Sequence, residues 1–434
     1  MTIEQLYDIY VQHSVVTTDS RITPEGSMFF ALKGERFDGN RYACTALESG
    51  CAYAVVDDAS CVPVGDTRYI LTDDVLTTLQ KLAHHHRRML QIPIIGITGT
   101  NGKTTTKELT AVTLSKKYNV LYTQGNLNNH IGVPLTLLRM REDHNIAIIE
   151  MGANHPGEIH ILTDIACPDY GIITNVGMAH LEGFGNIEGV LHTKGELYDS
   201  LRSHSDNTMV FLHADDERLQ SIVGSLPTRT YGINEGSRPM VLGEVTGRSP
   251  YLSFRWRALD GFWQEVDTHL IGDYNVYNAL AAITIATYFE VDEKAVCDAI
   301  RQYVPTNNRS QWVKTANNKL IVDTYNANPT SMNASLDNFA KVESPHKMVI
   351  LGEMSELGDA TYAAHQQIVD RLCNLSLDEA WLVGESFGKC QHSFRVFHDV
   401  DEVKGVLAEQ PLKDKTIFIK GSNRMRLFEL PELL

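Results

Sequence analysis

The sequence is poor in the features that mark secreted, membrane-embedded or nucleic-acid-binding proteins. Its seven cysteines are odd in number and form no Cys-x-x-Cys pair, so neither a disulfide framework nor a cysteine-rich zinc site is expected. No run of about 20 apolar residues occurs, and the N-terminus lacks the basic and apolar regions of a signal peptide. Positive charge is scarce: 38 Lys and Arg face 54 Asp and Glu, which disfavours nucleic-acid binding. We therefore expect a cytosolic protein that inserts into no membrane and meets any highly charged ligand at a local site.

The 434 residues divide by pattern into three blocks. Residues 1–90 contain short apolar runs between glycine-rich turns and end in a helical stretch. Residues 91–306 alternate buried-strand runs with helical stretches, which is typical of parallel βαβ units, and become strand-like and antiparallel over about 228–271. Residues 307–434 predict a smaller sheet of four strands separated by helices. The predicted fold class is α/β with three domains.

The strongest chemical motif is the segment GITGTNGKTTT, Gly96–Thr106, which follows a strand and opens a helix. The strict phosphate-loop pattern requires glycine where Ile97 stands, so the loop is a variant. Small residues still let backbone N–H groups surround phosphate oxygens, and the helix N-terminus adds partial positive charge. Lys103 is predicted to reach the terminal phosphates and Thr104 to offer its hydroxyl to Mg²⁺. We interpret the ligand as ATP, although the loop alone does not distinguish ATP from GTP. The predicted nucleotide contacts are Gly99, Thr100, Asn101, Gly102, Lys103, Thr104 and Thr105.

Two further polar residues follow buried strands of the same predicted sheet. Glu150 ends the run IAIIE, and His180 lies just beyond the next strand, at the carboxyl edge where open α/β sheets bind ligands. A carboxylate that ends a buried strand needs a partner, and a metal ion can serve. Three adjacent histidines, His84–His86, point in different directions on a helix, so we do not expect them to share a metal.

The pattern around other polar residues leaves their roles open. Lys194 is typical of a solvated helix lysine. Asn275 and Asn278 are three apart on one helix face, where their amides can cap the helix or contact a purine edge. Arg309 and Asp323 flank a turn and a strand, and Asp323 opens the polar loop DTYNANPTSM, which indicates a preformed binding loop.

Together these residues resemble the Mur ligases, the ATP-dependent amide-forming enzymes of peptidoglycan precursor synthesis, over essentially the whole chain. The shared elements are GTNGKTT, the strand end at Glu150, NVGMAHLEGFG, Lys194, GDYNVYNALAA, Arg309, Asp323 and the KGS at Lys420–Ser422. The resemblance implies an N-terminal UDP-substrate-binding domain at 1–90, a central P-loop ATPase domain at 91–306 and a C-terminal Rossmann-like ligase domain at 307–434.

Four segments narrow the resemblance to one branch of the family. They are Asp19–Tyr42, Gly125–Met140, Asp323–Met332 and Val349–Gly358. They are similar to the members that add D-alanyl-D-alanine to UDP-N-acetylmuramoyl-tripeptide through an acyl phosphate. The resemblance implies these two substrates, a cytoplasmic location and a monomer.

The family pattern also implies residue roles. Thr104, Glu150 and His180 match positions that hold magnesium, as two ions, and Lys194 matches a lysine that becomes carbamylated and supports the second ion. Lys103, Lys194, His180 and Glu150 are the implied catalytic residues. Asn275 and Asn278 match adenine recognition, and Arg309 and Asp323 match contacts to the phosphates and the ribose. The implied substrate contacts are Ser20, Arg21, Asn126, Asn128, Asn129, Tyr325, Asn326 and Asn328.

Two other functions remain open on the sequence. A sister ligase that adds glutamate to folate, or a diamino acid to a muramoyl dipeptide, would use the same Lys103, Glu150 and His180. A P-loop NTPase switch would hydrolyse nucleotide to drive a partner and would need neither substrate.

Overall fold

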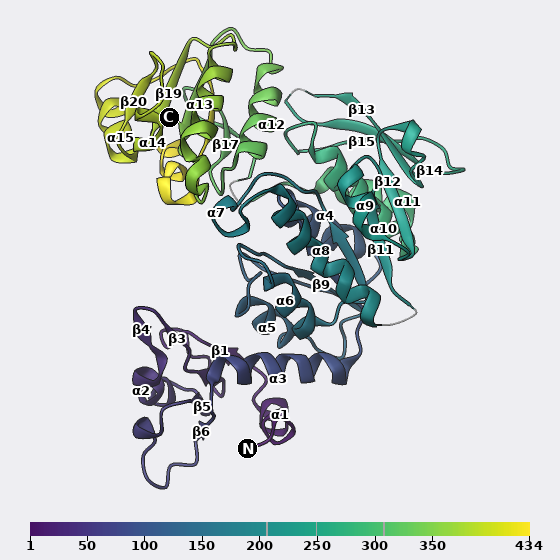
Figure 1. The fold of residues 1–434 in the computed structure, drawn as a ribbon, viewed down its shortest axis with the longest axis vertical. Coiled ribbons are helices and arrows are strands. Elements are labelled where there is room, and N and C mark those ends of the chain that lie inside the picture. The colour runs from purple at the N-terminus through teal and green to yellow at the C-terminus, as the bar shows by residue number, and fades with distance from the viewer. Residues whose placement is uncertain (205–206, 249, 307–308) are drawn as a thin grey trace.

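The computed structural model describes residues 1–204, 207–248, 250–306 and 309–434, and these form three domains in chain order (Figure 1). Each domain contains its own, largely parallel sheet, so the predicted three-domain α/β fold class is confirmed. Residues 307–308, where the third block was predicted to begin, lie outside the described residues.

The N-terminal domain contains a four-stranded parallel sheet in the order β1-β2-β5-β6. Alternate strand residues face opposite sides: Phe30 packs with α1 and α3, whereas Phe29 packs with α2. The elements are α1 (Ile3–Gln12), β1 (Val16–Thr17), β2 (Met28–Phe30), β3 (Lys33–Gly34), β4 (Phe37–Asp38), η1 (Gly39–Tyr42), α2 (Ala43–Glu48), β5 (Tyr53–Val56), η2 (Ala59–Cys61), β6 (Tyr69–Leu71) and α3 (Val75–Leu90).

The central domain contains a nine-stranded sheet in the order β15-β14-β13-β12-β11-β10-β7-β9-β8. Its elements are β7 (Ile94–Thr98), α4 (Lys103–Leu114), β8 (Val120–Tyr122), α5 (Gly132–Leu137), β9 (Ile146–Glu150), α6 (Glu158–Ala166), β10 (Tyr170–Ile173), α7 (Leu181–Phe184), α8 (Ile187–His204), β11 (Met209–His213), α9 (Glu217–Val223), β12 (Thr228–Gly232), η3 (Glu235–Ser237), β13 (Val241–Gly247), β14 (Ser253–Ala258), β15 (Gln264–Asp267), α10 (Asn275–Tyr288) and α11 (Glu293–Gln302).

The direction of one strand differs from the prediction. We expected 228–271 to be antiparallel, but β12 pairs in parallel with both β11 and β13, so the prediction was wrong for this strand. Within the described part of 228–271, the antiparallel pairs are β13–β14 and β14–β15. The loop 233–240 returns the chain to the start of the next strand, and an apolar alternation is the same whichever way a strand runs.

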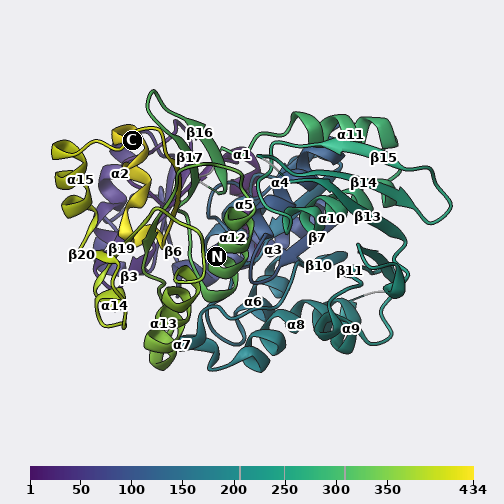
Figure 2. The same ribbon diagram turned by 90° about the horizontal axis from the view of Figure 1, so that it is seen from above.

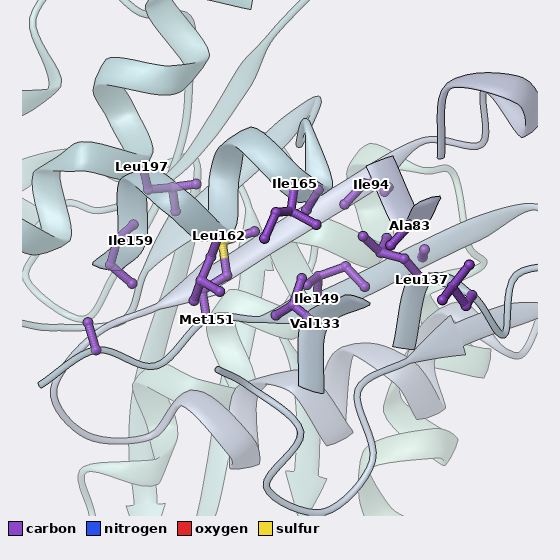
Figure 3. Packing of buried hydrophobic residues seen from close by; sticks show 14 of the residues in the cluster. Ala83, Ile94, Val133, Leu137, Ile149, Met151, Ile159, Leu162, Ile165 and Leu197 are labelled. Carbon is purple, nitrogen blue, oxygen red and sulfur yellow. The ribbon is translucent and has the colours of Figure 1, made fainter. Parts of the chain in front are cut away.

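The central sheet is covered on both faces. On one face α5, α6 and α8 pack with α3, so that Ala83 of α3 lies near Leu137 and Ile165 in one hydrophobic core (Figure 3). This packing attaches the N-terminal domain to the central one through apolar contacts. On the other face α4, α10 and α11 pack on Ile95, Ile97 and Ile148. With both faces buried, the carboxyl ends of the strands are left as the edge for a ligand.

The C-terminal domain contains a six-stranded sheet in the order β16-β17-β21-β18-β19-β20, antiparallel only at β16. It lies on the opposite side of the molecule from the β13–β15 extension (Figure 2). The elements are β16 (Gln311–Lys314), β17 (Lys319–Asp323), α12 (Pro329–Ala340), β18 (Lys347–Gly352), η4 (Gly358–Ala360), α13 (Thr361–Leu372), β19 (Glu379–Val383), α14 (Glu385–Gly388), β20 (Arg395–Phe397), α15 (Val400–Glu409), β21 (Thr416–Lys420), η5 (Asn423–Met425), η6 (Leu427–Glu429) and η7 (Pro431–Leu433).

Within the part of the chain that the structure describes, no helix combines the length and apolar character that crossing a membrane requires.

Candidate active site

A cavity of about 870 Å³ lies between the central and C-terminal domains. It brings together most of the residues that the sequence singled out. Those that line it are Thr100, Asn101, Gly102, Lys103, Thr105, Asn126, Asn128, Asn129, Glu150, His180, Asn275, Asn278, Arg309, Asp323, Tyr325, Asn326 and Asn328. Gly99, Thr104 and Lys194 do not line it, and Ser20 and Arg21 lie in the N-terminal domain away from it.

The loop between β7 and α4 has the close backbone packing that a phosphate loop requires. Gly99 and Gly102 have φ of 141° and 80°, in the region that favours glycine. A Cβ on Gly99 would lie 2.1 Å from the Thr174 hydroxyl oxygen, and one on Gly102 would lie 2.4 Å from the Asn278 amide oxygen. Because Gly102 has no side chain to cap α4, the first N–H groups of the helix remain available to an anion.

Lys103 folds back over this loop. Its Nζ donates to the carbonyl oxygens of Gly99 at 2.7 Å and Thr100 at 3.1 Å. Burial lowers the pKa of Lys103 to about 8, a shift that Glu150 opposes and Arg309 increases. A phosphate would bring the negative charge that this ammonium group lacks.

Glu150 lies at the floor of the cavity with only 1% of its surface exposed. Its Oε1 accepts from the Thr104 hydroxyl at 3.2 Å and from the Asn128 amide at 2.9 Å. Its Oε2 has no hydrogen-bond partner among the described residues, and the nearest cation, Lys107 Nζ, is 3.7 Å away. A buried carboxylate oxygen beside a hydroxyl suits Mg²⁺, which binds oxygen and takes its remaining ligands from phosphate and water. The residues present therefore fit a magnesium ion.

His180 connects the two domains at the mouth of the cavity. It precedes α7 with a φ of 51°, and its Nδ1 hydrogen bonds to the carboxylate of Glu356 in the C-terminal domain. This hydrogen bond is the main cause that lowers the pKa of Glu356. Across the described ranges no three His, Cys, Asp or Glu side chains form a metal cluster. A magnesium ion here would therefore depend on hydroxyl, phosphate and water oxygens as well.

Lys194 is not the solvated helix lysine that its local pattern indicates. It is 2% exposed, and its Nζ lies 3.4 Å from the Ala153 carbonyl oxygen and 5.3 Å from the centre of the Phe184 ring. In the described part of the chain it has no ion-pair partner. Burial lowers the pKa of Lys194 to about 7, and the nearby Lys103 contributes to the shift. The amine is thus half neutral near pH 7, which makes it nucleophilic.

The two asparagines of α10 link this helix to α4. Asn278 Nδ2 donates to Asn275 Oδ1 at 2.7 Å, and Asn278 Oδ1 accepts from the Thr106 hydroxyl at 3.1 Å. Asn275 Nδ2 donates to the Ile271 carbonyl at 2.8 Å. The residue that precedes the helix is Tyr274, which makes no capping hydrogen bond, so neither asparagine is the N-cap. Both face the cavity beside the phosphate loop.

The C-terminal domain brings polar loops to the same cavity. Asp323 at the end of β17 forms an ion pair with Lys420 at the end of β21, at 2.6 Å. The Arg309 guanidinium lies 3.9 Å from the centre of the Tyr325 ring, and its buried Nε has no partner among the described residues. These cationic groups lie opposite the phosphate loop of the central domain.

The two domains also touch directly. Asn328 caps α12 through Ser331, and its Nδ2 donates to Asn101 Oδ1 in the phosphate loop at 2.9 Å. Behind it, the Met178 N–H donates to the Thr330 hydroxyl at 3.1 Å. The start of α12 is therefore held against the loop that would carry the nucleotide phosphates.

Among the lining residues to which sequence reasoning assigned no role are Glu356, Lys420 and His213. Lys420 ends the apolar strand TIFIK just as Glu150 ends IAIIE, and that position was a usable signal. Glu356 meets His180 only because two domains pack together, which no local pattern reveals.

Comparisons with known proteins match all three domains. Family models described as "Mur ligase family, catalytic domain", "Mur ligase middle domain" and "Mur ligase, glutamate ligase domain" match residues 13–87, 97–286 and 308–423. The chain is 34% identical to the UDP-N-acetylmuramoyl-tripeptide–D-alanyl-D-alanine ligase of Bacillus subtilis (strain 168), covering 98% of this chain and 93% of that protein.

Solved structures agree with this similarity. A crystal structure of MurF from Acinetobacter baumannii matches with a TM-score of 0.84 and 30% identity, over 96% of this chain and 92% of that one. The MurF ligase of Thermotoga maritima, solved in complex with ADP, matches with a TM-score of 0.83 and 26% identity over 96% of each chain.

Proposed function

Since the chain belongs to the Mur ligase family, we propose that it joins D-alanyl-D-alanine to UDP-N-acetylmuramoyl-tripeptide and releases ADP and phosphate. The observation that carries the proposal is the near full-length similarity to a ligase of that name. The cavity supports it, because a phosphate loop, polar loops and a C-terminal domain meet there in one space.

The chemistry requires an activated acid. A carboxylate repels an incoming amine and has no acceptable leaving group. Transfer of the γ-phosphoryl group of ATP to the terminal carboxylate of the tripeptide gives an acyl phosphate, in which phosphate can leave. The dipeptide amine then attacks the acyl carbon, and the tetrahedral intermediate collapses to an amide and phosphate.

The residues of the phosphate loop stabilise and position the transferred group. Lys103 neutralises its charge, and the N–H groups at the start of α4 hold the neighbouring phosphates. Thr104, Glu150 and His180 would hold magnesium as two ions, with Lys194 supporting the second once it is modified. When bound, magnesium polarises the phosphoryl oxygens and screens their charge.

Lys194 is proposed to carry a carbamate. Its neutral amine attacks the carbon of CO₂, a C–N bond forms, and one proton leaves to solvent. The product is an anion in place of a buried cation, next to Ala153, which lines the cavity. Its lowered pKa of about 7 supports the step, because only the unprotonated amine reacts.

The remaining roles follow from position in the cavity. Asn275 and Asn278 contact the adenine, and Arg309 and Asp323 contact the phosphates and the ribose. Asn126, Asn128 and Asn129 contact the UDP-linked substrate together with Ser20 and Arg21 of the N-terminal domain. Tyr325, Asn326 and Asn328 contact the dipeptide or take part in closure.

The C-terminal domain protects the acyl phosphate from water. The Asn101–Asn328 and His180–Glu356 contacts hold it against the central domain. We propose that ATP and the UDP-linked substrate promote closure by rotation of residues 307–434. X-ray scattering profiles that stay the same when both ligands are added would contradict this rotation.

A coupled phosphate-release assay tests the function. The full-length protein is given ATP, magnesium, UDP-N-acetylmuramoyl-tripeptide and either D-alanyl-D-alanine, other dipeptides or single amino acids. Phosphate release should require both the UDP-linked substrate and D-alanyl-D-alanine, with a new amide in the product by mass spectrometry. Turnover with glutamate and folate, or with a diamino acid and a muramoyl dipeptide, would indicate a sister ligase. Turnover with nucleotide alone would indicate an NTPase switch.

Two further properties belong to the proposal. We propose that the enzyme works in the cytoplasm and as a monomer. Cell fractionation tests the location, and the molar mass measured by light scattering in solution tests the monomeric state.

A further inference from the structure

His213 lines the nucleotide cavity and takes no part in the roles described above. It is the last residue of β11, two strands from the phosphate-loop strand at the carboxyl edge of the central sheet. Its ring stacks on Tyr231, with centroids 5.4 Å apart and planes 7° apart, and lies 4.1 Å from the Tyr277 ring centroid. Tyr277 is the neighbour of Asn278 on α10, so the imidazole lies beside the proposed adenine contacts.

The ring is buried without the hydrogen bonds that buried imidazoles have elsewhere in the described chain. His213 is 8% exposed, and neither Nδ1 nor Nε2 has a hydrogen-bond partner among the described residues. By contrast, His365 accepts from the Met354 N–H at 3.0 Å and bonds the Thr361 carbonyl at 2.7 Å. An unpaired buried polar atom is costly, and a ligand in the cavity can remove that cost.

The surroundings determine which group the ring presents. Burial lowers the pKa of His213, although Asp215, Asp216 and the backbone of Thr174 oppose the shift. The imidazole is therefore neutral and has one donor and one acceptor nitrogen. The Thr174 N–H already donates to the Thr98 carbonyl at 2.9 Å, and a group that favours the protonated ring must be an acceptor. The Thr174 carbonyl forms no hydrogen bond with the ring, but its attraction for the ring N–H favours the tautomer in which the other ring nitrogen is an acceptor.

We propose that His213 reads the exocyclic amine at C6 of the nucleotide base and so selects adenine over 6-oxo purines. Adenine presents an N–H donor at this position, whereas guanine and hypoxanthine present an oxygen acceptor. Two acceptors that face each other in a buried site have no shared proton, so a 6-oxo base leaves both unpaired. The phosphate loop does not distinguish these bases, and this residue would. The inference rests on the proposed function, because it takes ATP as the nucleotide that binds in the cavity.

Nucleotide binding tests the proposal on the full-length protein with magnesium. Dissociation constants for ADP and for inosine diphosphate are measured by isothermal titration calorimetry. The wild-type protein should bind ADP at least about tenfold more tightly than inosine diphosphate. His213→Phe keeps the aromatic volume and removes the acceptor. It should weaken ADP binding about tenfold and change inosine diphosphate binding less than about twofold, so that the preference disappears.

Two further variants exclude a general structural effect. His213→Asn keeps an amide oxygen and should retain an ADP preference of at least about threefold. His365→Phe changes a buried imidazole outside the cavity and should lower stability without changing the preference. Thermal unfolding of each variant without nucleotide measures the stability effect separately. If His213→Phe does not fold, the preference for ADP over inosine diphosphate in His213→Asn and in the wild-type protein tests the proposal instead.

The outcomes separate this inference from the proposed function. Equal weakening of both nucleotides by His213→Phe, or no wild-type preference, overturns the inference even when ligation proceeds. A preference that depends on His213 in a protein that forms no amide leaves base reading intact and overturns the proposed function instead.

Discussion

The central and C-terminal domains each have a turn in which a glycine connects a parallel strand to a helix. Of these two turns, one is open to an anion and the other is not. In the central domain, Gly102 leads into α4 without a side-chain cap. In the C-terminal domain, Gly384, with φ of 118°, joins β19 to α14, and the carboxylate of Glu353 already lies there. Glu353 Oε2 accepts from the Ser386 N–H at 3.0 Å, and Oε1 accepts from Arg424 at 2.9 Å.

The difference shows that a turn at the carboxyl end of a strand can bind a ligand when no side chain of the protein already bonds its N–H groups. Burial alone would raise the pKa of Glu353, but the Ser386 hydrogen bonds and Arg424 outweigh burial and lower it. The C-terminal edge thus contains its own anion. Among the described residues, the central edge holds Glu150 Oε2, which accepts no hydrogen bond, and Lys194, which has no ion-pair partner.

Two buried lysines, one from each domain, differ in the same way: one has a charged partner and the other does not. Lys194 and Lys420 are each 2% exposed. Lys420 pairs with Asp323 at 2.6 Å, whereas Lys194 contacts a carbonyl oxygen and an aromatic ring but no carboxylate of the described residues. An ammonium group without a carboxylate partner in such a place is costly, so chemical modification or a ligand can stabilise it.

The largest effect should come from the phosphate-loop lysine. Lys103→Ala removes the cation that neutralises the transferred phosphoryl group, and turnover in the phosphate-release assay should fall at least about a thousandfold. Lys389→Ala, which removes an exposed lysine near the self-occupied C-terminal edge, is the matched control and should keep activity within about twofold. Comparable losses of turnover in both variants would contradict the view that only the turn of the central domain binds the nucleotide phosphates.

The two carboxylates should fail in different ways. Glu150→Gln should lower turnover by about a hundredfold or more, because it weakens the proposed magnesium site, and added magnesium should restore part of it. Glu353→Gln should instead reduce the free energy of unfolding by about 1–2 kcal/mol, because charged hydrogen bonds to Ser386 and Arg424 are lost. Denaturant titration and the assay separate the two. An activity loss without a stability loss in Glu353→Gln would show that the turn at Gly384 also binds ligand.

The pH dependence of Lys194 sharpens the lysine comparison. A lowered pKa of about 7 means that the neutral amine, and with it the carbamate, is lost as the pH falls through about 7. Activity of bicarbonate-depleted enzyme should therefore recover on adding bicarbonate above pH 7 and recover less at pH 6. Lys194→Ala should lose about a hundredfold in turnover and regain part of it with short carboxylic acids. A bicarbonate response that persists in Lys194→Ala would contradict the carbamate.

Local patterns were enough to predict much of this edge. Glycines between a strand and a helix, and apolar strands that end in a charged residue, are visible in the sequence, which is why Gly102, Glu150 and Asp323 were found. These signals depend on the backbone of a few consecutive residues.

What the sequence did not reveal depends on packing between distant segments. Lys194 reads as exposed because its neighbours on α8 are polar, yet Phe184 and Ala153 from other segments cover it. The direction of β12 depends on a connecting loop rather than on apolar alternation. Likewise, Glu356 became a site residue only through the docking of one domain on another.

The smallest effect should come from the exposed ion pair between the same two domains. Asp273 Oδ2 accepts from Arg248 at 2.8 Å within the central domain and from Lys341 at 2.9 Å across the interface. The Lys341 side chain is 53% exposed, so solvent and salt screen the pair, and it should contribute no more than about 1 kcal/mol to closure. Lys341→Met should therefore raise the apparent KM for ATP by less than about fivefold, with kcat unchanged, and the difference should shrink in high salt. The half-buried contact from Asn328 to Asn101 carries more of the closure, because water competes less for it and because Asn328 also caps α12. A larger rise in KM for Lys341→Met than for Asn328→Ala would reverse this order. It would show that the exposed ion pair, and not the Asn328–Asn101 contact, contributes most to holding the domains together.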